Sequence, residues 1–145
     1  MMTGIIVANT ILKLSFDEQN LVTPMKLQKL VYCTYKKHLK EYGEKLFLEP
    51  FMKWKYGPVL ESVYNAYKLY GPNPITGYCQ DINGQVTVLN MSTPSKARES
   101  IVDTWIKYRN YSAWELSKLT HGENTAWSKS TFDLNDEDIY NEPDF

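Results

Sequence analysis

Apolar residues near the start of the chain recur at the spacing of one face of a helix. The pattern predicts a helix that begins after Thr3, whose hydroxyl can cap the first turn. Its apolar face consists of Ile5, Ala8, Ile11 and Leu12.

A second helix has clearer boundaries. Thr23 followed by Pro24 is a strong start signal, because a hydroxyl caps free N–H groups and proline fits the first helical position. This helix should run to about Tyr42, since Gly43 can take the left-handed conformation that often ends helices.

The middle of the chain changes from extended to helical. Residues 48–55 alternate loosely between apolar and polar side chains, which favours an extended segment or a short strand ending at Tyr56. Pro58 then predicts the start of another helix, which should run to Tyr70 and stop at Gly71.

A β-hairpin is predicted within residues 78–90. Two short runs flank Asn83-Gly84, the favoured residue pair for a two-residue type I′ turn.

Three more helical segments are predicted in the last third of the chain. One should cover residues 96–109, and a capping-box pattern at Ser112 and Glu115 should open a short helix to about Leu119. A last turn or two is expected around residues 124–129.

These elements predict a mainly α protein of the α+β kind, a compact helical domain with a small inserted β-hairpin. The domain should span residues 1–132, and residues 133–145 should form an acidic C-terminal tail. The tail has no Lys or Arg and six acidic residues, which are Asp133, Asp136, Glu137, Asp138, Glu142 and Asp144.

Composition favours an interaction protein. The net charge is −1, so no overall field draws the chain to nucleic acid or to a membrane, although the chain without its tail is mildly basic. Aromatic residues make up 14% of the chain, including eleven Tyr and four Trp. Because Tyr and Trp suit both small cores and protein interfaces, this excess raises the expectation of an interface.

The cysteines and histidines predict no metal site. Cys33 and Cys79 have no CxxC spacing, and His38 and His121 do not complete a convincing zinc site with them. We expect free thiols in a reducing compartment and no cofactor. The apolar start lacks a basic region and a cleavage site and is interrupted by Asn9, so we expect neither a signal peptide nor a membrane span, and a cytoplasmic location.

Common enzyme motifs, such as GxSxG, a glycine-rich phosphate loop and HExxH, do not occur in the sequence. His121 is the one plausible acid–base group, but a lone histidine at a helix end is more often structural. We therefore expect no enzymatic activity. The alternative is a small hydrolase or transferase that uses His121 with Ser117, Thr120 or Glu123 nearby.

Five lysines of the second helix fall within one arc of its circumference, with no acidic residue between the first and the last. Apolar residues cover much of the remaining surface, so the helix should be buried on most sides and present a basic ridge to water. The ridge is either a plain solvated face or a docking strip for another protein, for the protein's own tail or for a phosphate backbone. Nucleic acid is the least favoured partner, because lysine without arginine reads bases poorly. The ridge consists of Lys26, Lys29, Lys36, Lys37 and Lys40.

The segment Trp54–Val59 (WKYGPV) favours a structural corner over a binding site. Gly57 allows a positive φ, and Pro58 can fix the start of a helix. Trp54 and Tyr56 would lie on the same side of an extended strand and face the helices.

Three segments together resemble the Panacea domain of the SocA-like antitoxin family, in the family's order and over about residues 3–130. They are Thr23–Tyr32 (TPMKLQKLVY), Phe51–Val59 (FMKWKYGPV) and Glu115–His121 (ELSKLTH), followed by Trp127. The resemblance implies a compact, mainly helical domain with a small β element. It also implies scaffold roles for Pro24, Leu27, Leu30, Tyr32, Gly57, Pro58, Gly71, Thr120, His121 and Trp127.

The resemblance further implies that the protein is an antitoxin of a bacterial or phage toxin–antitoxin pair. Members of the family usually neutralise a toxin by direct binding, and SocA-type members deliver the toxin to a bacterial protease. We expect the partner contacts at Trp54, Tyr56 and Tyr64, with the basic ridge as a charged rim. An enzyme using His121 and a weak nucleic-acid-binding regulator are the alternatives. The identity of the toxin and the oligomeric state stay open.

Overall fold

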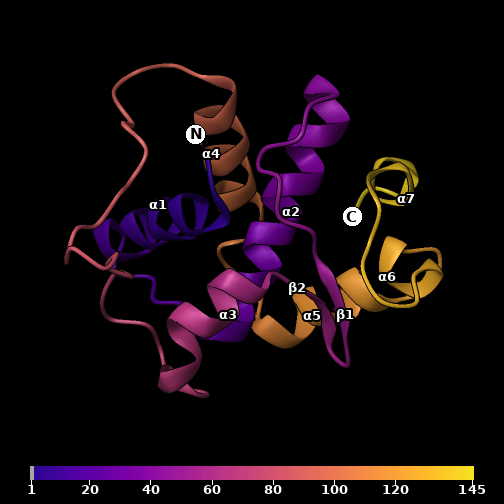
Figure 1. Ribbon diagram of the computed structural model, residues 1–145, viewed down its shortest axis with the longest axis horizontal. Coiled ribbons are helices and arrows are strands. Elements are labelled where there is room, and N and C mark those ends of the chain that lie inside the picture. Colours follow the sequence, from indigo (N-terminus) through magenta and orange to yellow (C-terminus); the bar gives the residue numbers. More distant parts are fainter. Residues whose placement is uncertain (1) are drawn as a thin grey trace.

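The computed structural model describes residues 2–145, and one central helix, α2 (Pro24–Tyr42), organises the fold (Figure 1). This helix contacts α1, α3, α4, α5, α7 and strand β2. The mainly α class with a small β-hairpin is confirmed. The elements are α1 (Gly4–Asp17), α2, β1 (Met52–Trp54), β2 (Gly57–Val59), α3 (Glu61–Tyr67), the 3₁₀ turn η1 (Lys68–Tyr70), α4 (Lys96–Tyr108), α5 (Ala113–His121), α6 (Ala126–Lys129) and α7 (Asp136–Asn141).

The helix ends follow the capping signals of the sequence. The hydroxyls of Thr3 and Thr23 accept hydrogen bonds from backbone N–H groups of the first turns of α1 and α2. Gly43 ends α2 with a φ of 65°, and both bonds of the capping box at Ser112 and Glu115 are formed. These predicted boundaries are confirmed.

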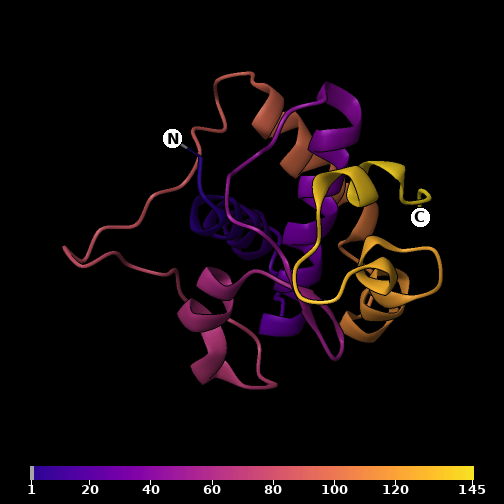
Figure 2. The same ribbon diagram turned by 45° about the vertical axis from the view of Figure 1, so that its right-hand side comes forward.

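The β-hairpin lies at Met52–Val59 and not at residues 78–90, so its predicted position is wrong. The turn predicted at Asn83-Gly84 does form, and the Asp81 N–H donates across it to the Gln85 carbonyl at 2.8 Å. No strand follows it in the described residues, since side chains of α1 bind the flanking backbone instead. The amide of Asn9 donates to the carbonyls of Cys79 and Thr87 at 3.2 and 3.4 Å. This extended, irregular segment between η1 and α4 projects from the helices (Figure 2).

Pro58 lies in β2, opposite Lys53, and does not open the next helix as predicted. Helix α3 begins only at Glu61. The cause is Gln28 of α2, whose side-chain amide accepts from the N–H of Leu60 and donates to its carbonyl, both at 2.9 Å. These two bonds hold Leu60 in an extended conformation, as a neighbouring strand would.

The segment after α6 returns across α2. The N–H of Leu134 donates to the carbonyl of Phe51 at 2.8 Å, and α7 packs on α2 with Ile139 buried between them. In both views this last segment lies on the opposite side of α2 from α1 (Figures 1 and 2).

The core is apolar and continuous around α2. The side chains of Leu27, Leu30 and Val31 are entirely buried, and Trp105 of α4 and Leu116 of α5 close the core from two sides. Within residues 2–145, no helix combines the length and the apolar character that crossing a membrane requires.

Candidate protein-binding site

Three aromatic side chains are exposed at the hairpin, and we call them the hairpin face: Trp54, Tyr56 and Tyr64. Their exposed fractions are 37%, 51% and 41%. The rings of Trp54 and Tyr64 pack edge to face, with their centroids 4.7 Å apart. The expectation that Trp54 and Tyr56 face the core is therefore wrong, because their rings lie at the surface.

The backbone beneath these rings is held by the helices that follow. The Trp127 indole N–H donates to the carbonyl of Trp54 at 2.6 Å, and the Ser117 hydroxyl donates to the carbonyl of Tyr56. The ammonium of Lys53 donates to the carbonyl of Ser130 at 2.9 Å and lies 4.4 Å from the Trp127 ring centroid. The hairpin face thus combines exposed rings with a fixed backbone, which reduces the entropy lost on binding.

Gly57 and Lys29 anchor the hairpin to α2. Gly57 has a φ of 121°, and a Cβ there would lie 3.0 Å from the Thr120 hydroxyl and 3.1 Å from the Lys29 ammonium nitrogen. That nitrogen donates to the carbonyl of Pro58 at 3.0 Å. Lys29 is 2% exposed and makes no ion pair within the described residues. Burial lowers its pKa to about 8.

The basic ridge predicted on α2 does not face water. Lys26, Lys29 and Lys36 are each at most 9% exposed, and Lys37 and Lys40 are partly exposed. The prediction is wrong for the first three because neighbouring segments cover their long stems, as with the Lys26 ammonium, which donates to the carbonyl of Arg109.

The acidic tail supplies the counter-charges for this side of α2. Lys36 pairs with Glu142 at 2.8 Å, and Lys40 pairs with Asp144 at 2.8 Å. Lys36 and Lys40 of the ridge therefore contact the protein's own tail, which was one of the acidic partners expected from the sequence.

Glu142 is the centre of a buried polar cluster. Its carboxylate accepts from the Tyr32 hydroxyl at 3.0 Å, from the Lys36 ammonium at 2.8 Å and from the Ala126 N–H at 2.8 Å. Burial, with the neighbouring Glu142 carboxylate, raises the pKa of Tyr32 far above its ordinary value. Burial lowers the pKa of Lys36, and Glu142 opposes that shift.

Most of the remaining motif residues lie in or beside the core, whereas Gly71 is exposed. Leu27, Leu30 and Thr120 are entirely buried. Pro24 forms the first turn of α2, and Gly71 follows η1 with a φ of 59°. These positions agree with scaffold roles, which stay an inference from the family resemblance.

His121 lies in a structural setting. Its Nδ1 contacts the carbonyl of Ser117 one turn earlier in α5, and its ring packs edge to face on Trp127 at 5.3 Å. The Ser117 hydroxyl is already bonded to Tyr56. The Ser117 hydroxyl lies 3.4 Å from His121 Nδ1, but each of the two groups is engaged by a backbone carbonyl, so the pair is held as part of the scaffold. Among residues 2–145, no three His, Cys, Asp or Glu side chains gather closely enough to hold a metal ion.

Two contributors were missed from the sequence. Phe132, which is 72% exposed, borders the hairpin because its carbonyl accepts from the N–H of Lys53 at 2.9 Å. Glu142 was grouped with the other tail acids. The signal that could have distinguished it is the apolar residue Ile139 one turn earlier, which indicates that this side of the tail packs inward.

The buried ammonium of Lys29 predicts a dependence of stability on pH. Its pKa is about 8 in the folded protein, whereas an ordinary lysine has a pKa of 10.5, so between these pH values the unfolded chain binds more protons. Lys29 therefore makes the free energy of unfolding increase as the pH rises. Relative to Lys29→Met, the wild type should become more stable by roughly 2 kcal/mol between pH 7 and pH 10.

Urea unfolding of both proteins at each pH measures this difference. Lys68→Met, at an exposed lysine, is the matched control and should parallel the wild type. Parallel curves for the wild type and Lys29→Met would contradict the prediction.

Comparison with known proteins assigns the chain to a protein family. The sequence profile described as "Antitoxin SocA-like, Panacea domain" matches residues 27–128, most of the chain, including α2 from Leu27, the hairpin and α5. The chain therefore belongs to the SocA-like antitoxin family with the Panacea domain.

A curated relative is Antitoxin SocA of Caulobacter vibrioides (strain NA1000 / CB15N), which is 27% identical to this chain over 109 residues. The match covers 73% of this chain and 58% of the relative, so this chain spans less than two thirds of the relative's length. No solved structure matches the chain.

Proposed function

We propose that this protein is a non-enzymatic antitoxin that neutralises a toxin protein by direct contact through the hairpin face. Membership of an antitoxin family supports the class of activity. The observation that supports this contact surface is the exposure of three aromatic rings. The backbone of Trp54 and Tyr56 is fixed by α5 and α6, and the Tyr64 ring of α3 packs on Trp54. Exposed aromatic anchors on a rigid support are typical of the residues that dominate protein interfaces.

The charged rim of this surface differs from the one expected from the sequence. Lys55 is exposed at the turn between Trp54 and Tyr56, and its ammonium lies 5.3 Å from the Tyr56 ring centroid. Because three of the five α2 lysines are buried, Lys55 and the partly exposed Lys53 are better placed to steer an acidic partner.

Co-expression with each neighbouring reading frame tests the class of activity. A toxic neighbour should be neutralised, and the two proteins should co-purify. Loss of the toxin from the cell only when a protease is present would instead favour delivery for degradation. If the protein neutralises none of its neighbours, the proposal that it is the antitoxin of a toxin encoded beside it is contradicted.

Substitutions at the hairpin face test the surface. Trp54→Ala and Tyr64→Ala should each weaken toxin binding about tenfold, because each removes an aromatic anchor of more than about 1 kcal/mol. Isothermal titration measures the dissociation constants.

Tyr140→Ala is the matched control for these variants, because Tyr140 is a similarly exposed tyrosine on α7. Equal affinity of the wild type and both hairpin variants would show that the toxin binds elsewhere.

A further inference from the structure

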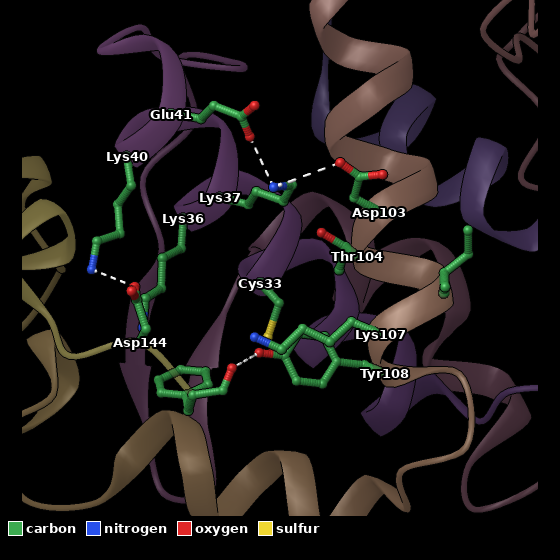
Figure 3. Close-up of a pocket in the computed structure, with 12 residues that line it drawn as sticks. Cys33, Lys36, Lys37, Lys40, Glu41, Asp103, Thr104, Lys107, Tyr108 and Asp144 are labelled. Carbon is green, nitrogen blue, oxygen red and sulfur yellow. Dashed lines mark hydrogen bonds and ion pairs between the residues drawn. The ribbon is translucent and has the colours of Figure 1, made fainter.

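A groove lies between α2 and α4, on the side of α2 where the last residues of the tail dock (Figure 3). We call it the α2–α4 groove, and its volume is about 720 Å³. It lies apart from the hairpin-face residues, none of which lines it. Its lining consists of Cys33, Lys36, Lys37, Lys40, Glu41, Asp103, Thr104, Ile106, Lys107, Tyr108, Asp144 and Phe145.

One buried group in the groove lacks a partner. The hydroxyl oxygen of Thr104 is the one buried side-chain polar atom in the described part of the chain without a hydrogen bond. Thr104 is 2% exposed, and its oxygen points toward α2 across the groove (Figure 3). An unsatisfied buried hydroxyl destabilises a fold by about 1–3 kcal/mol, so its position in a groove indicates a missing partner.

The charges of the groove favour an acidic occupant. Lys107 forms no ion pair within residues 2–145, and Lys40 pairs only with Asp144, whose side chain is 86% exposed. Exposed pairs contribute little to stability, so this contact can exchange for another carboxylate. The acids that line α2 and α4 themselves, Glu41 and Asp103, both lie beside Lys37.

The tail already shows how an acidic peptide is recognised here. The centroid of the Phe145 ring lies 3.4 Å from the Lys36 ammonium, and the backbone oxygen of Phe145 accepts from the Tyr108 hydroxyl. The carbonyl of Pro143 accepts from Lys36 at 2.6 Å. Glu142 is deeply buried, whereas Pro143 and Asp144 are exposed, so the tail has a buried anchor followed by a solvent-accessible end.

We propose that the α2–α4 groove binds an acidic, aromatic-containing peptide of a partner protein, and that residues 143–145 occupy part of it as an internal competitor. The partner peptide places a carboxylate near Lys40 and Lys107, packs an aromatic ring beside Lys36, and bonds the Thr104 hydroxyl. Glu142 keeps its buried position throughout. The proposal does not depend on the antitoxin assignment, since it concerns a separate surface.

The probe is a fluorescent peptide with the sequence of residues 139–145, IYNEPDF, titrated against the full chain and followed by fluorescence anisotropy. Binding to the variant with Asp144→Asn and Phe145→Ala should be about tenfold tighter than binding to the wild type, because a tethered competitor acts at a high effective concentration. The peptide IYNEPNA should bind neither protein.

Two further variants locate the site. Lys40→Glu combined with Lys107→Glu, in the Asp144→Asn, Phe145→Ala background, should abolish binding, while Lys68→Glu in the same background should leave it unchanged. Thr104→Val should weaken peptide binding several-fold and raise the melting temperature, since it removes the unsatisfied hydroxyl. A threonine with only a structural role would change the melting temperature alone.

The proposal would be overturned by no binding to the variant with the altered tail, by binding that survives Lys40→Glu with Lys107→Glu, or by an unchanged affinity after Thr104→Val. A ten-nucleotide oligodeoxythymidine that binds in place of the peptide, with the same dependence on Lys40 and Lys107, would also overturn it, because the groove would then recognise phosphate.

Discussion

Replacing Glu142 with Gln should lower the free energy of unfolding by about 3 kcal/mol. The substitution keeps the shape of the side chain but removes the charge that faces the ammonium of Lys36, and the side chains of Lys36 and Glu142 are only 7% and 0% exposed. Breaking a buried ion pair from one side is costly, because the remaining charge stays out of water without a counter-ion. The hydroxyl of Tyr32 would also lose a charged acceptor.

Urea unfolding measures this loss, and Glu137→Gln is the matched control. Glu137 lies on α7 in the same acidic tail, but it makes no ion pair within the described residues, so its change should be below about 0.5 kcal/mol. The double variant Lys36→Met with Glu142→Gln should recover part of the loss, since it leaves no unpaired buried charge and the Gln oxygen can still accept from Tyr32 and Ala126. A loss for Glu142→Gln as small as the control's would show that the tail does not hold its observed position in solution.

Replacing Gly57 with Ala should lower the free energy of unfolding by about 3 kcal/mol. Two costs combine at this position. A φ of 121° is unfavourable for a residue with a Cβ, and the new methyl group would meet the side chains of Thr120 and Lys29 at close range. The Lys29 ammonium would have to move away from the carbonyl of Pro58, which would loosen the hairpin from α2.

Gly43→Ala separates the two costs. Gly43 also has a positive φ, of 65°, but a methyl group at this position would have no neighbour within 4 Å. Its cost should therefore be about 1 kcal/mol, the conformational part alone. Equal losses for Gly57→Ala and Gly43→Ala in thermal unfolding would contradict the close contact with Lys29.

Most of the helices could be predicted because their signals are local, but α7 in the acidic tail was not predicted. A threonine and a proline start α2, and a glycine ends it, each acting on the backbone beside it. The hairpin could not be placed, since turn chemistry alone does not decide pairing. Asn83-Gly84 offers a good turn, but Asn9, seventy or more residues away, binds the backbone that a second strand would have needed.

The lysines of α2 show a different limit of sequence reasoning. Helical periodicity predicted one exposed arc, but it could not show that the hairpin, the segment after α4 and the tail cover Lys29, Lys26 and Lys36. The three residues of the hairpin face were named from the sequence as partner contacts, and the structure shows them exposed. Their binding role stays a proposal, and Thr104 had no signal in the sequence at all.

The Glu142 cluster has a practical consequence for the choice of expression fragments of this protein. The profile match ends at residue 128, whereas the carboxylate that completes the surroundings of Tyr32 and Lys36 belongs to residue 142. A fragment cut at the homology boundary would carry a solvent-exposed cavity in place of that carboxylate and should be prone to aggregation. Expression fragments of this protein should therefore extend beyond α7, past the point where the family match stops.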